Sequence, residues 1–224
     1  MRNDLTNPPG PPMLRAARMT LRLLRESDRA EYVRAMTISE SHLRATSPRR
    51  PEGQTIEMLF ERNLARGIEE FGSGRAARLV GFLDDGRMAG MFSLNNIVRG
   101  VFQCGDAGWG VMADCTGRGL ATEGVRALLD YAFSPDVNGL GLHRVQANII
   151  PSNTASLHVA RKCGFREEGL GRRMLRIDDR WQDHVMLAKL AEEHFGDCRA
   201  DQPLCHANIT QTWVEDNFQR SECE

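Results

Sequence analysis

The chain has 224 residues, of which 29 are basic and 30 acidic, so its formal net charge is −1. This balance excludes the broad positive field of a nucleic-acid-binding domain, although every basic residue except Lys162 and Lys189 is an arginine. No apolar run approaches the roughly 20 residues that cross a bilayer, and residues 1–13 lack the apolar core of a secretory signal. We therefore expect a cytoplasmic protein with reduced cysteines that binds neither nucleic acid nor membrane.

The first part of the chain predicts one strand followed by two helices. Residues 19–24 alternate as in a strand, and the pattern that follows predicts a helix that runs through Met36. A loop is expected next, because residues 47–51 read Ser-Pro-Arg-Arg-Pro. Apolar side chains then recur at helical spacing across residues 55–71, which predicts the second helix.

The rest of the chain predicts a hairpin, two strand–helix units and a closing hairpin. Asp-Gly between two apolar runs is a strong hairpin signal, and a glycine after an amphipathic run is suited to end a helix. The expected elements are strands at 77–83, 87–94 and 104–112, a helix at 117–133, a strand at 143–150, a helix at 151–164, and strands at 165–177 and 181–190. This order predicts an α/β (α+β) fold with a mixed, mostly antiparallel sheet of six to seven strands and helices on both faces.

Three segments are expected along the chain. Residues 1–13 are rich in proline and predict a flexible arm, residues 14–190 form the domain, and residues 191–224 are a polar, acidic extension. The extension contains residues that could in principle bind zinc. These residues are His194, Cys198, Cys205 and His206. Their spacing contains no compact Cys-x-x-Cys pair, so we expect no metal site.

A glycine-rich turn between a strand and a helix is the first feature with chemistry. Residues 113–122 read Ala-Asp-Cys-Thr-Gly-Arg-Gly-Leu-Ala-Thr. Gly117 and Gly119 allow the backbone to turn its N–H groups outward, and the helix start adds partial positive charge, which suits a pyrophosphate. The pair alone is weak, because it lacks the Lys-Ser/Thr ending of a P-loop and the third glycine of a dinucleotide fingerprint.

Two later motifs accompany this turn and together carry a family resemblance. Residues 117–123 read G-R-G-L-A-T-E, residues 148–156 read N-I-I-P-S-N-T-A-S, and residues 164–165 are Gly-Phe. From Met19 to Leu190 the chain resembles the GCN5-related N-acetyltransferases, and within them the ribosomal-protein-alanine N-acetyltransferases. The resemblance implies an acyltransferase that uses acetyl-CoA and no metal.

The resemblance also implies where acetyl-CoA binds. Its pyrophosphate would lie on the glycine-rich turn, and its pantetheine arm would follow the fourth strand, which splays from the fifth. The implied cofactor-binding residues are Gly110, Val111, Met112, Gly117, Arg118, Gly119, Leu120, Ala121, Thr122, Asn148, Asn153 and Ser156. Asp114 departs from the Gln or Arg usual in the family, so its carboxylate must point away from the phosphate, and Arg118 is expected to compensate for its charge.

Ser156 and Asn153 have two interpretations that the sequence leaves open. The resemblance implies that Asn153 contacts the cofactor and that Ser156 is a general acid facing the thiolate. The local pattern equally predicts Asn153 as a helix cap and Ser156 as a first-turn residue.

The general base does not carry over from the family. A related branch has a glutamate where this chain has Leu175. The remaining candidates are Asp106, Glu168, Asp183 and His184, each of which has surface or packing contacts as its alternative. Asp106 and Glu168 are the two base candidates that we retain.

The expected reaction is direct acetyl transfer to a primary amine. An α-amine, with a pKa of about 8, needs less deprotonation than a lysine at about 10.4, so we expect the N-terminus of a protein or peptide. A small-molecule amine is the alternative, and a non-catalytic CoA-binding regulator is a weaker one. Acidic residues near the closing hairpin and tail could attract a basic peptide. These residues are Asp178, Asp179, Asp183, Glu192, Glu193 and Asp197. The protein is expected to be a monomer or homodimer.

Overall fold

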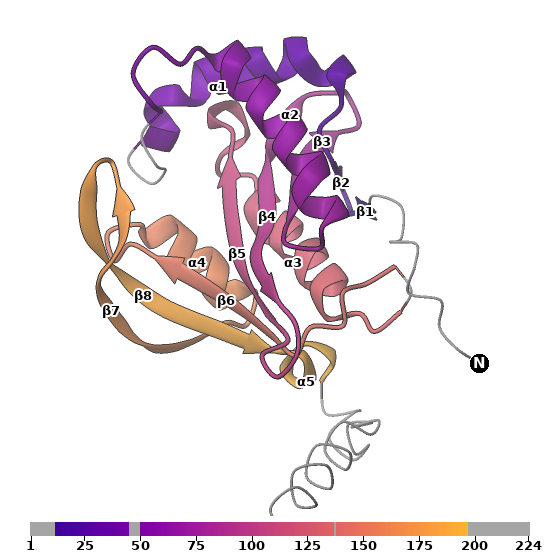
Figure 1. The fold of residues 1–224 in the computed structure, drawn as a ribbon, viewed down its shortest axis with the longest axis vertical. Helices are drawn as coiled ribbons and strands as arrows, with labels where there is room; N and C mark the ends of the chain where they lie inside the picture. The colour runs from indigo at the N-terminus through magenta and orange to yellow at the C-terminus, as the bar shows by residue number, and fades with distance from the viewer. Residues whose placement is uncertain (1–11, 45–49, 137, 197–224) are drawn as a thin grey trace, which may run out of the picture. The chain divides into compact units, whose positions relative to one another are not determined.

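The computed structural model describes residues 12–44, 50–136 and 138–196, and the chain up to His194 belongs to one compact unit. Figure 1 shows a central sheet, whose eight strands have the order β1-β2-β3-β4-β5-β6-β8-β7. Neighbouring strands are antiparallel except β5 and β6, which run parallel. The strands are β1 (Met13–Arg15), β2 (Met19–Arg22), β3 (Ala77–Leu83), β4 (Met88–Val98), β5 (Cys104–Val111), β6 (Arg144–Ile149), β7 (Arg166–Ile177) and β8 (Arg180–Leu190). The predicted mixed, mostly antiparallel sheet is confirmed.

The sheet has one strand more than the sequence predicts. β1 pairs with β2 along the edge of the sheet, from Met13 opposite Arg22 to Arg15 opposite Thr20. A three-residue strand is too short to show alternation, so the prediction of an arm over residues 1–13 includes the first residue of β1. Residues 1–11 lie outside the described residues, as do residues 197–224 of the predicted extension.

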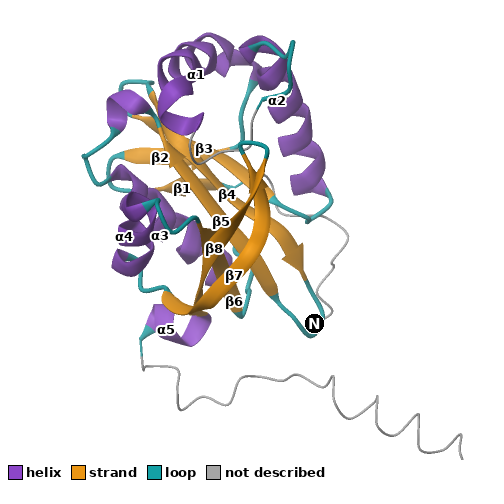
Figure 2. Ribbon diagram, turned by 90° about the vertical axis from the view of Figure 1, so that its left-hand side faces the viewer, coloured by secondary structure: helices purple, strands orange, loops and turns teal. Residues whose placement is uncertain are grey.

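Helices cover both faces of the sheet, as predicted (Figure 2). They are α1 (Arg29–Arg44), α2 (Ile56–Gly72), α3 (Leu120–Phe133), α4 (Thr154–Lys162) and α5 (Ala191–Phe195), with short 3-10 turns η1 (Glu26–Asp28) and η2 (Ala113–Cys115). Alternation along the central strands explains the two layers. Gly110 of β5 faces Leu43 of α1, whereas Phe92 of β4 lies against Gly124 of α3. None of the described helices combines the length and apolar character needed to cross a bilayer.

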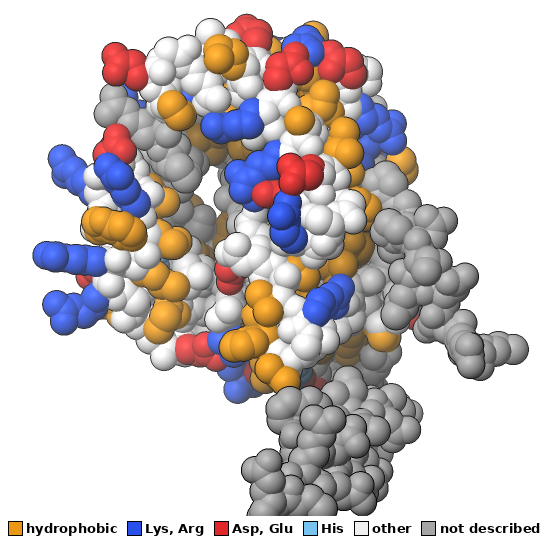
Figure 3. All heavy atoms as spheres, viewed as in Figure 1, with side chains coloured by type: hydrophobic (Ala, Val, Ile, Leu, Met, Phe, Trp, Pro, Cys, Tyr) orange, Lys and Arg blue, Asp and Glu red, His pale blue; other side chains and the backbone are white. Residues whose placement is uncertain are grey.

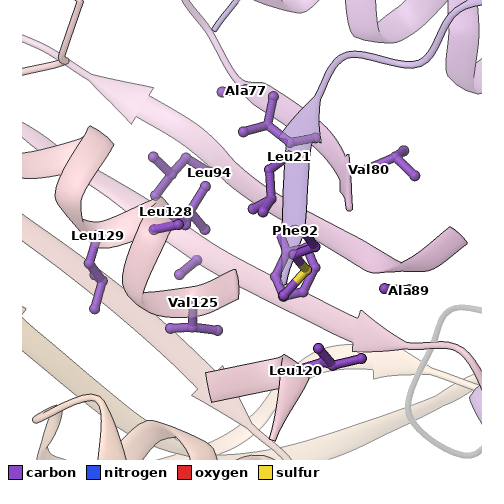
Figure 4. Packing of buried hydrophobic residues seen from close by; sticks show 14 of the residues in the cluster. Leu21, Ala77, Val80, Ala89, Phe92, Leu94, Leu120, Val125, Leu128 and Leu129 are labelled. Atoms are coloured by element: carbon purple, nitrogen blue, oxygen red, sulfur yellow. The ribbon is translucent and has the colours of Figure 1, made fainter. Parts of the chain in front are cut away.

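The main core lies between α3 and the sheet. Leu120, Val125, Leu128 and Leu129 of α3 are at most 1% exposed, and Figure 4 shows Leu128 beside Leu94 of β4 on the side of the helix that faces the strands. Burial of each such side chain stabilises the fold by roughly 1.5–3 kcal/mol. This packing fixes the first turn of α3, which is part of the site described below.

Helix α1 is longer than predicted. The sequence indicated a helix through Met36 and then a loop, but the helix continues to Arg44. Ala35, Ser39 and Leu43 are buried at a spacing of four residues, so one continuous stripe faces the sheet. Because the middle residue of this stripe is a serine, the apolar periodicity in the sequence is interrupted. Ser39 accepts a hydrogen bond from the backbone N–H of Ala113 at 2.9 Å.

Candidate functional site

The two central parallel strands, β5 and β6, are paired along only part of their length. Their register runs from Cys104 opposite Arg144 to Asp106 opposite Gln146 and stops there. Residues 107–111 of β5 and 147–149 of β6 therefore have no partner across this gap, and Figure 1 shows the strands diverging. The expected splay between the fourth and fifth predicted strands is present, here between β5 and β6.

The backbone groups that face the gap follow from the register. The backbone N–H of Met112 donates to the carbonyl oxygen of Ala89 on β4 at 2.9 Å. Backbone groups alternate in direction along a strand, so every second residue of β5 bonds to β4 and the residues between them direct their N–H and C=O groups toward β6. The N–H and C=O groups of Trp109 and Val111 consequently face the gap. The backbone N–H of Ala191 donates to the carbonyl oxygen of His143, just before β6, at 2.9 Å. By the same alternation, the odd-numbered residues of β6 bond to β8, and the N–H and C=O groups of Asn148 face β5. An extended ligand that carries amide groups can pair with such an open strand edge.

The glycine-rich turn begins where β5 ends. Gly117 and Gly119 have φ angles of 71° and 78°, a left-handed conformation that favours glycine. The first helical hydrogen bond of α3 is donated by the backbone N–H of Glu123 to the carbonyl oxygen of Gly119, at 3.2 Å. The N–H groups of Leu120, Ala121 and Thr122 precede it and have no acceptor within the helix. These amides and the positive end of the α3 dipole form an anion site.

Arg18 holds this turn from outside the motif. Its backbone N–H and its Nε, the latter at 2.8 Å, both donate to the Glu123 carboxylate. Its Nη2 donates to the carbonyl oxygen of Arg118 at 2.9 Å. Because one side chain bonds both the turn and the first turn of α3, it fixes their relative position. The sequence analysis did not identify Arg18, which lies 105 residues from Glu123 and belongs to no local pattern.

Asp114 is directed away from the turn, as the physical argument required. Its carboxylate lies 3.2 Å from Nη1 of Arg34 on α1. Arg34 also binds Glu31 at 2.7 Å, and this hydrogen bond lowers the pKa of the Glu31 carboxyl. In the described part of the chain the exposed Arg118 side chain forms no hydrogen bond or ion pair, so it can approach an anion on the turn.

The start of α4 follows β6. Asn153 is the N-cap, and its side-chain oxygen accepts the backbone N–H of Ser156 at 3.1 Å. The predicted capping role of Asn153 is therefore confirmed, while its contact with the cofactor stays a prediction. Ser156 is half-buried, and its hydroxyl has no hydrogen-bond partner among the described residues. The hydroxyl is thus not consumed by helix capping.

The two retained base candidates occupy different environments. Asp106 accepts hydrogen bonds from the neutral amides of Asn96 at 2.8 Å and Gln146 at 3.5 Å, where the pairing of β5 and β6 ends. Glu168 instead has both oxygens bound to the Arg144 guanidinium, and this interaction lowers the pKa of the Glu168 carboxyl. A carboxylate bound by a cation is less basic and is therefore a poorer proton acceptor. The geometry therefore favours Asp106 over Glu168.

The other base candidates lie on the β7–β8 hairpin. Asp183 accepts the backbone N–H of Arg173 at 2.7 Å, which supports an irregularity in β7. His184 is buried, and its Nδ1 lies 3.0 Å from the carbonyl oxygen of Gln182. Leu175 lies opposite Gln182. The described residues contain no cluster of three metal-ligating side chains, while Cys198, Cys205 and His206 lie outside them.

A cleft of about 1110 Å³ opens on the α1–α2 face of the sheet. Its walls come from α1, α2, the segment before α2 and strands β3–β5, and its floor includes Gly108, Trp109 and Gly110. The same stretch of β5 therefore borders the cleft and the gap. The Trp109 ring lies 6.3 Å from the Phe165 ring, and its indole N–H is buried without a partner among the described residues.

Comparisons with known proteins agree with this geometry. A family model described as an acetyltransferase (GNAT) domain matches residues 18–166. The chain is 27% identical over 173 residues to the ribosomal protein uS5-alanine N-acetyltransferase of Escherichia coli, and this match covers 76% of this chain and 87% of that protein. It is 40% identical over 106 residues to the probable N-acetyltransferase YjcK of Bacillus subtilis, and this match spans about half of each chain, 47% and 56%.

A solved structure shows the same fold with a related sequence. Mycobacterium smegmatis RimJ in complex with CoA-disulfide has a TM-score of 0.71 and 31% identity, and the match covers 82% of this chain and 87% of that one. The glycine-rich turn, the splayed strands and the N-terminus of α4 all lie in the matched region or directly beside it. The chain therefore belongs to the GNAT family of acetyltransferases and is an acyltransferase enzyme.

Proposed function

We propose that this protein transfers the acetyl group of acetyl-CoA to the N-terminal α-amine of a protein or peptide. The observation that carries the proposal is the position of residues 108–110 of β5, which border the gap toward β6 on one side and the cleft on the other. A cofactor in the gap and an amine in the cleft would meet at this strand. The cytoplasmic location and the monomer or homodimer state stay predictions.

The residues around the gap fit acetyl-CoA. The amides of the turn and the exposed Arg118 would hold the pyrophosphate. The open backbone groups of Trp109 and Asn148 would pair with the two amides of the pantetheine arm. When bound, acetyl-CoA supplies the acetyl thioester and its thiolate is the leaving group.

The chain's own residues have three tasks in the transfer. The Val111 N–H would donate to the carbonyl oxygen as negative charge develops on it. The Ser156 hydroxyl would give its proton to the departing sulfur and regain one from solvent. A chain of water molecules leading to Asp106 would take up the proton of the attacking amine, and Asp106 would then release it to solvent, so the products are the acetylated amine and the free thiol. An α-amine suits this site because about one in ten is neutral at pH 7, roughly two orders of magnitude more than for lysine.

A matched pair of peptides tests the proposal. One peptide has a free N-terminus and no lysine, and the other has a blocked N-terminus and one lysine. We expect thiol release and a mass increase of one acetyl group with the first peptide only. Equal modification of both peptides contradicts the proposed acceptor. Modification of neither, together with consumption of a small amine, would favour the small-molecule alternative.

A further inference from the structure

The charged residues that line the cleft are mostly basic, although the whole chain has a net charge of −1. Four arginines and two glutamates line it: Arg44, Arg50, Arg62, Arg78, Glu40 and Glu52. This composition differs from the acidic surface that the sequence suggested for attraction of a basic peptide. Figure 3 shows Lys and Arg side chains interspersed with Asp and Glu on the face that contains α1 and α2.

Ion pairs neutralise only two of these arginines. Arg50 binds Glu40 at 2.5 Å, and Arg78 binds Glu70 of α2 at 2.5 Å. Arg44, in the last turn of α1, and Arg62, on α2, are exposed and have neither an ion pair nor a hydrogen bond within the described residues. The charge that remains available to a ligand is therefore positive.

Two of the acidic residues considered from the sequence, Glu193 and Asp183, are bound by groups of the chain itself. Glu193 accepts the Leu190 N–H at 3.0 Å and pairs with Arg166 at 2.8 Å. Its helix α5 begins at Ala191, which bonds to His143 just before β6, at the opposite end of β6 from the gap. Asp183 is held by the Arg173 backbone. Within the described cleft lining, Glu52 is the one acid without an ion-pair partner.

A peptide amide would also meet a suitable group in the cleft. The side-chain oxygen of Gln54 is buried and has no hydrogen-bond donor in the described structure. A buried oxygen without a donor costs about 1–3 kcal/mol, and a small rotation of the side chain would allow it to accept a peptide N–H. A polyamine would instead bring several cations next to Arg44 and Arg62.

We propose that the cleft selects acceptor N-termini that carry acidic side chains close behind the α-amine, and that Arg44 and Arg62 recognise them. This inference rests on the proposed function. With the amine at β5, an extended chain advances roughly 3.3–3.6 Å per residue. The second to fourth residues would then lie about 3–11 Å beyond the first residue, along the walls made by α1 and α2.

The test compares two peptides with the same length and first residue, one with Asp and Glu and the other with Lys and Arg at positions two to four. We expect kcat/KM for the acidic peptide to be higher by about ten-fold at low salt, and the ratio to shrink as ionic strength rises. Arg44→Gln and Arg62→Gln should each reduce the ratio about three-fold. Intrinsic amine reactivity cancels when the ratio is compared between variants.

Three further measurements separate the possible outcomes. Arg75→Gln removes an exposed arginine that does not line the cleft, and it should leave the ratio unchanged. Arg62→Glu should shift the preference toward the basic peptide. Gln54→Leu should slow both peptides equally. A ratio that stays the same in both Arg44→Gln and Arg62→Gln, or a wild-type preference for the basic peptide, overturns the inference while leaving N-terminal transfer intact. Acetylation of spermidine and of neither peptide overturns the proposed function, and the inference with it.

Discussion

In the proposed function, the two sides of β5 would recognise their ligands with different chemical groups. The gap side presents backbone amides from β5, β6 and the first turn of α3, arranged by glycines and by one arginine clamp. The cleft side presents side chains from α1, α2 and the segment before α2. Backbone amides suit a ligand whose pyrophosphate and amides never change, whereas side chains can vary with the acceptor. The cofactor side therefore carries the recognisable motifs, and the acceptor side carries the specificity.

The largest expected effect is on the gap side. Gly119→Glu should weaken acetyl-CoA binding at least about 100-fold, because a non-glycine residue is strained at a φ of 78° and the new carboxylate would face the pyrophosphate. Calorimetric titration measures the affinity. Gly74→Glu is the matched control, since Gly74 has a φ of 68°, has open space around it and is not part of the site. Unchanged affinity in Gly119→Glu would rule out the turn as the phosphate site.

Ser156→Ala tests the chemistry at the junction of the two sides. If the hydroxyl protonates the leaving thiolate, kcat should fall by about 100-fold while cofactor affinity and KM stay close to wild type. Ser152→Ala, an exposed serine just before the Asn153 cap, serves as the control. Loss of thermal stability with a normal kcat would show instead that Ser156 serves only the helix.

Arg18→Ala tests whether the position of the glycine-rich turn relative to α3 contributes to acetyl-CoA binding. The clamp does not itself need to touch the cofactor, but without it the turn and α3 can move relative to each other. We expect acetyl-CoA affinity to fall about ten-fold, with little change in acceptor KM at saturating cofactor. Arg15→Ala removes a neighbouring surface ion pair with Asp84 and should have no effect. The same loss of affinity in Arg15→Ala would show that Arg18 has no special role.

The sequence predicts the gap side far better than the cleft. The turn, the Asn153 cap and the splayed strand can be inferred because each depends on residues within a few positions of one another. Arg18 could not be inferred, because its partners are brought to it by the sheet. The end of α1 was missed because Ser39 interrupts the apolar stripe. The basic cleft was also missed, since total charge does not reveal that Glu40 and Glu70 neutralise two of its arginines.

The smallest expected effect concerns Glu168, which the sequence offered as a base. Its ion pair with Arg144 lowers the pKa of the carboxyl in the folded state, so the pair stabilises the fold above the unfolded pKa of about 4.3. That contribution is lost as pH falls through the folded pKa. Because the Glu168 side chain is 44% exposed, the ion pair should contribute no more than about 1 kcal/mol to the free energy of unfolding at neutral pH.

Glu168→Gln should therefore lower the stability of the fold slightly and leave kcat almost unchanged. The variant should unfold at a lower denaturant concentration than wild type at pH 7, and the difference should shrink as pH falls below about 4.3 and vanish once pH is below the lowered folded pKa. Its kcat should stay within about two-fold of wild type, whereas loss of a general base would cost at least about 100-fold. Glu167→Gln, at an exposed neighbouring carboxylate without an ion pair in the described structure, controls for the change in net charge. A large fall in kcat that is specific to Glu168→Gln would indicate that Glu168 on β7 is the general base and would contradict the role proposed for Asp106.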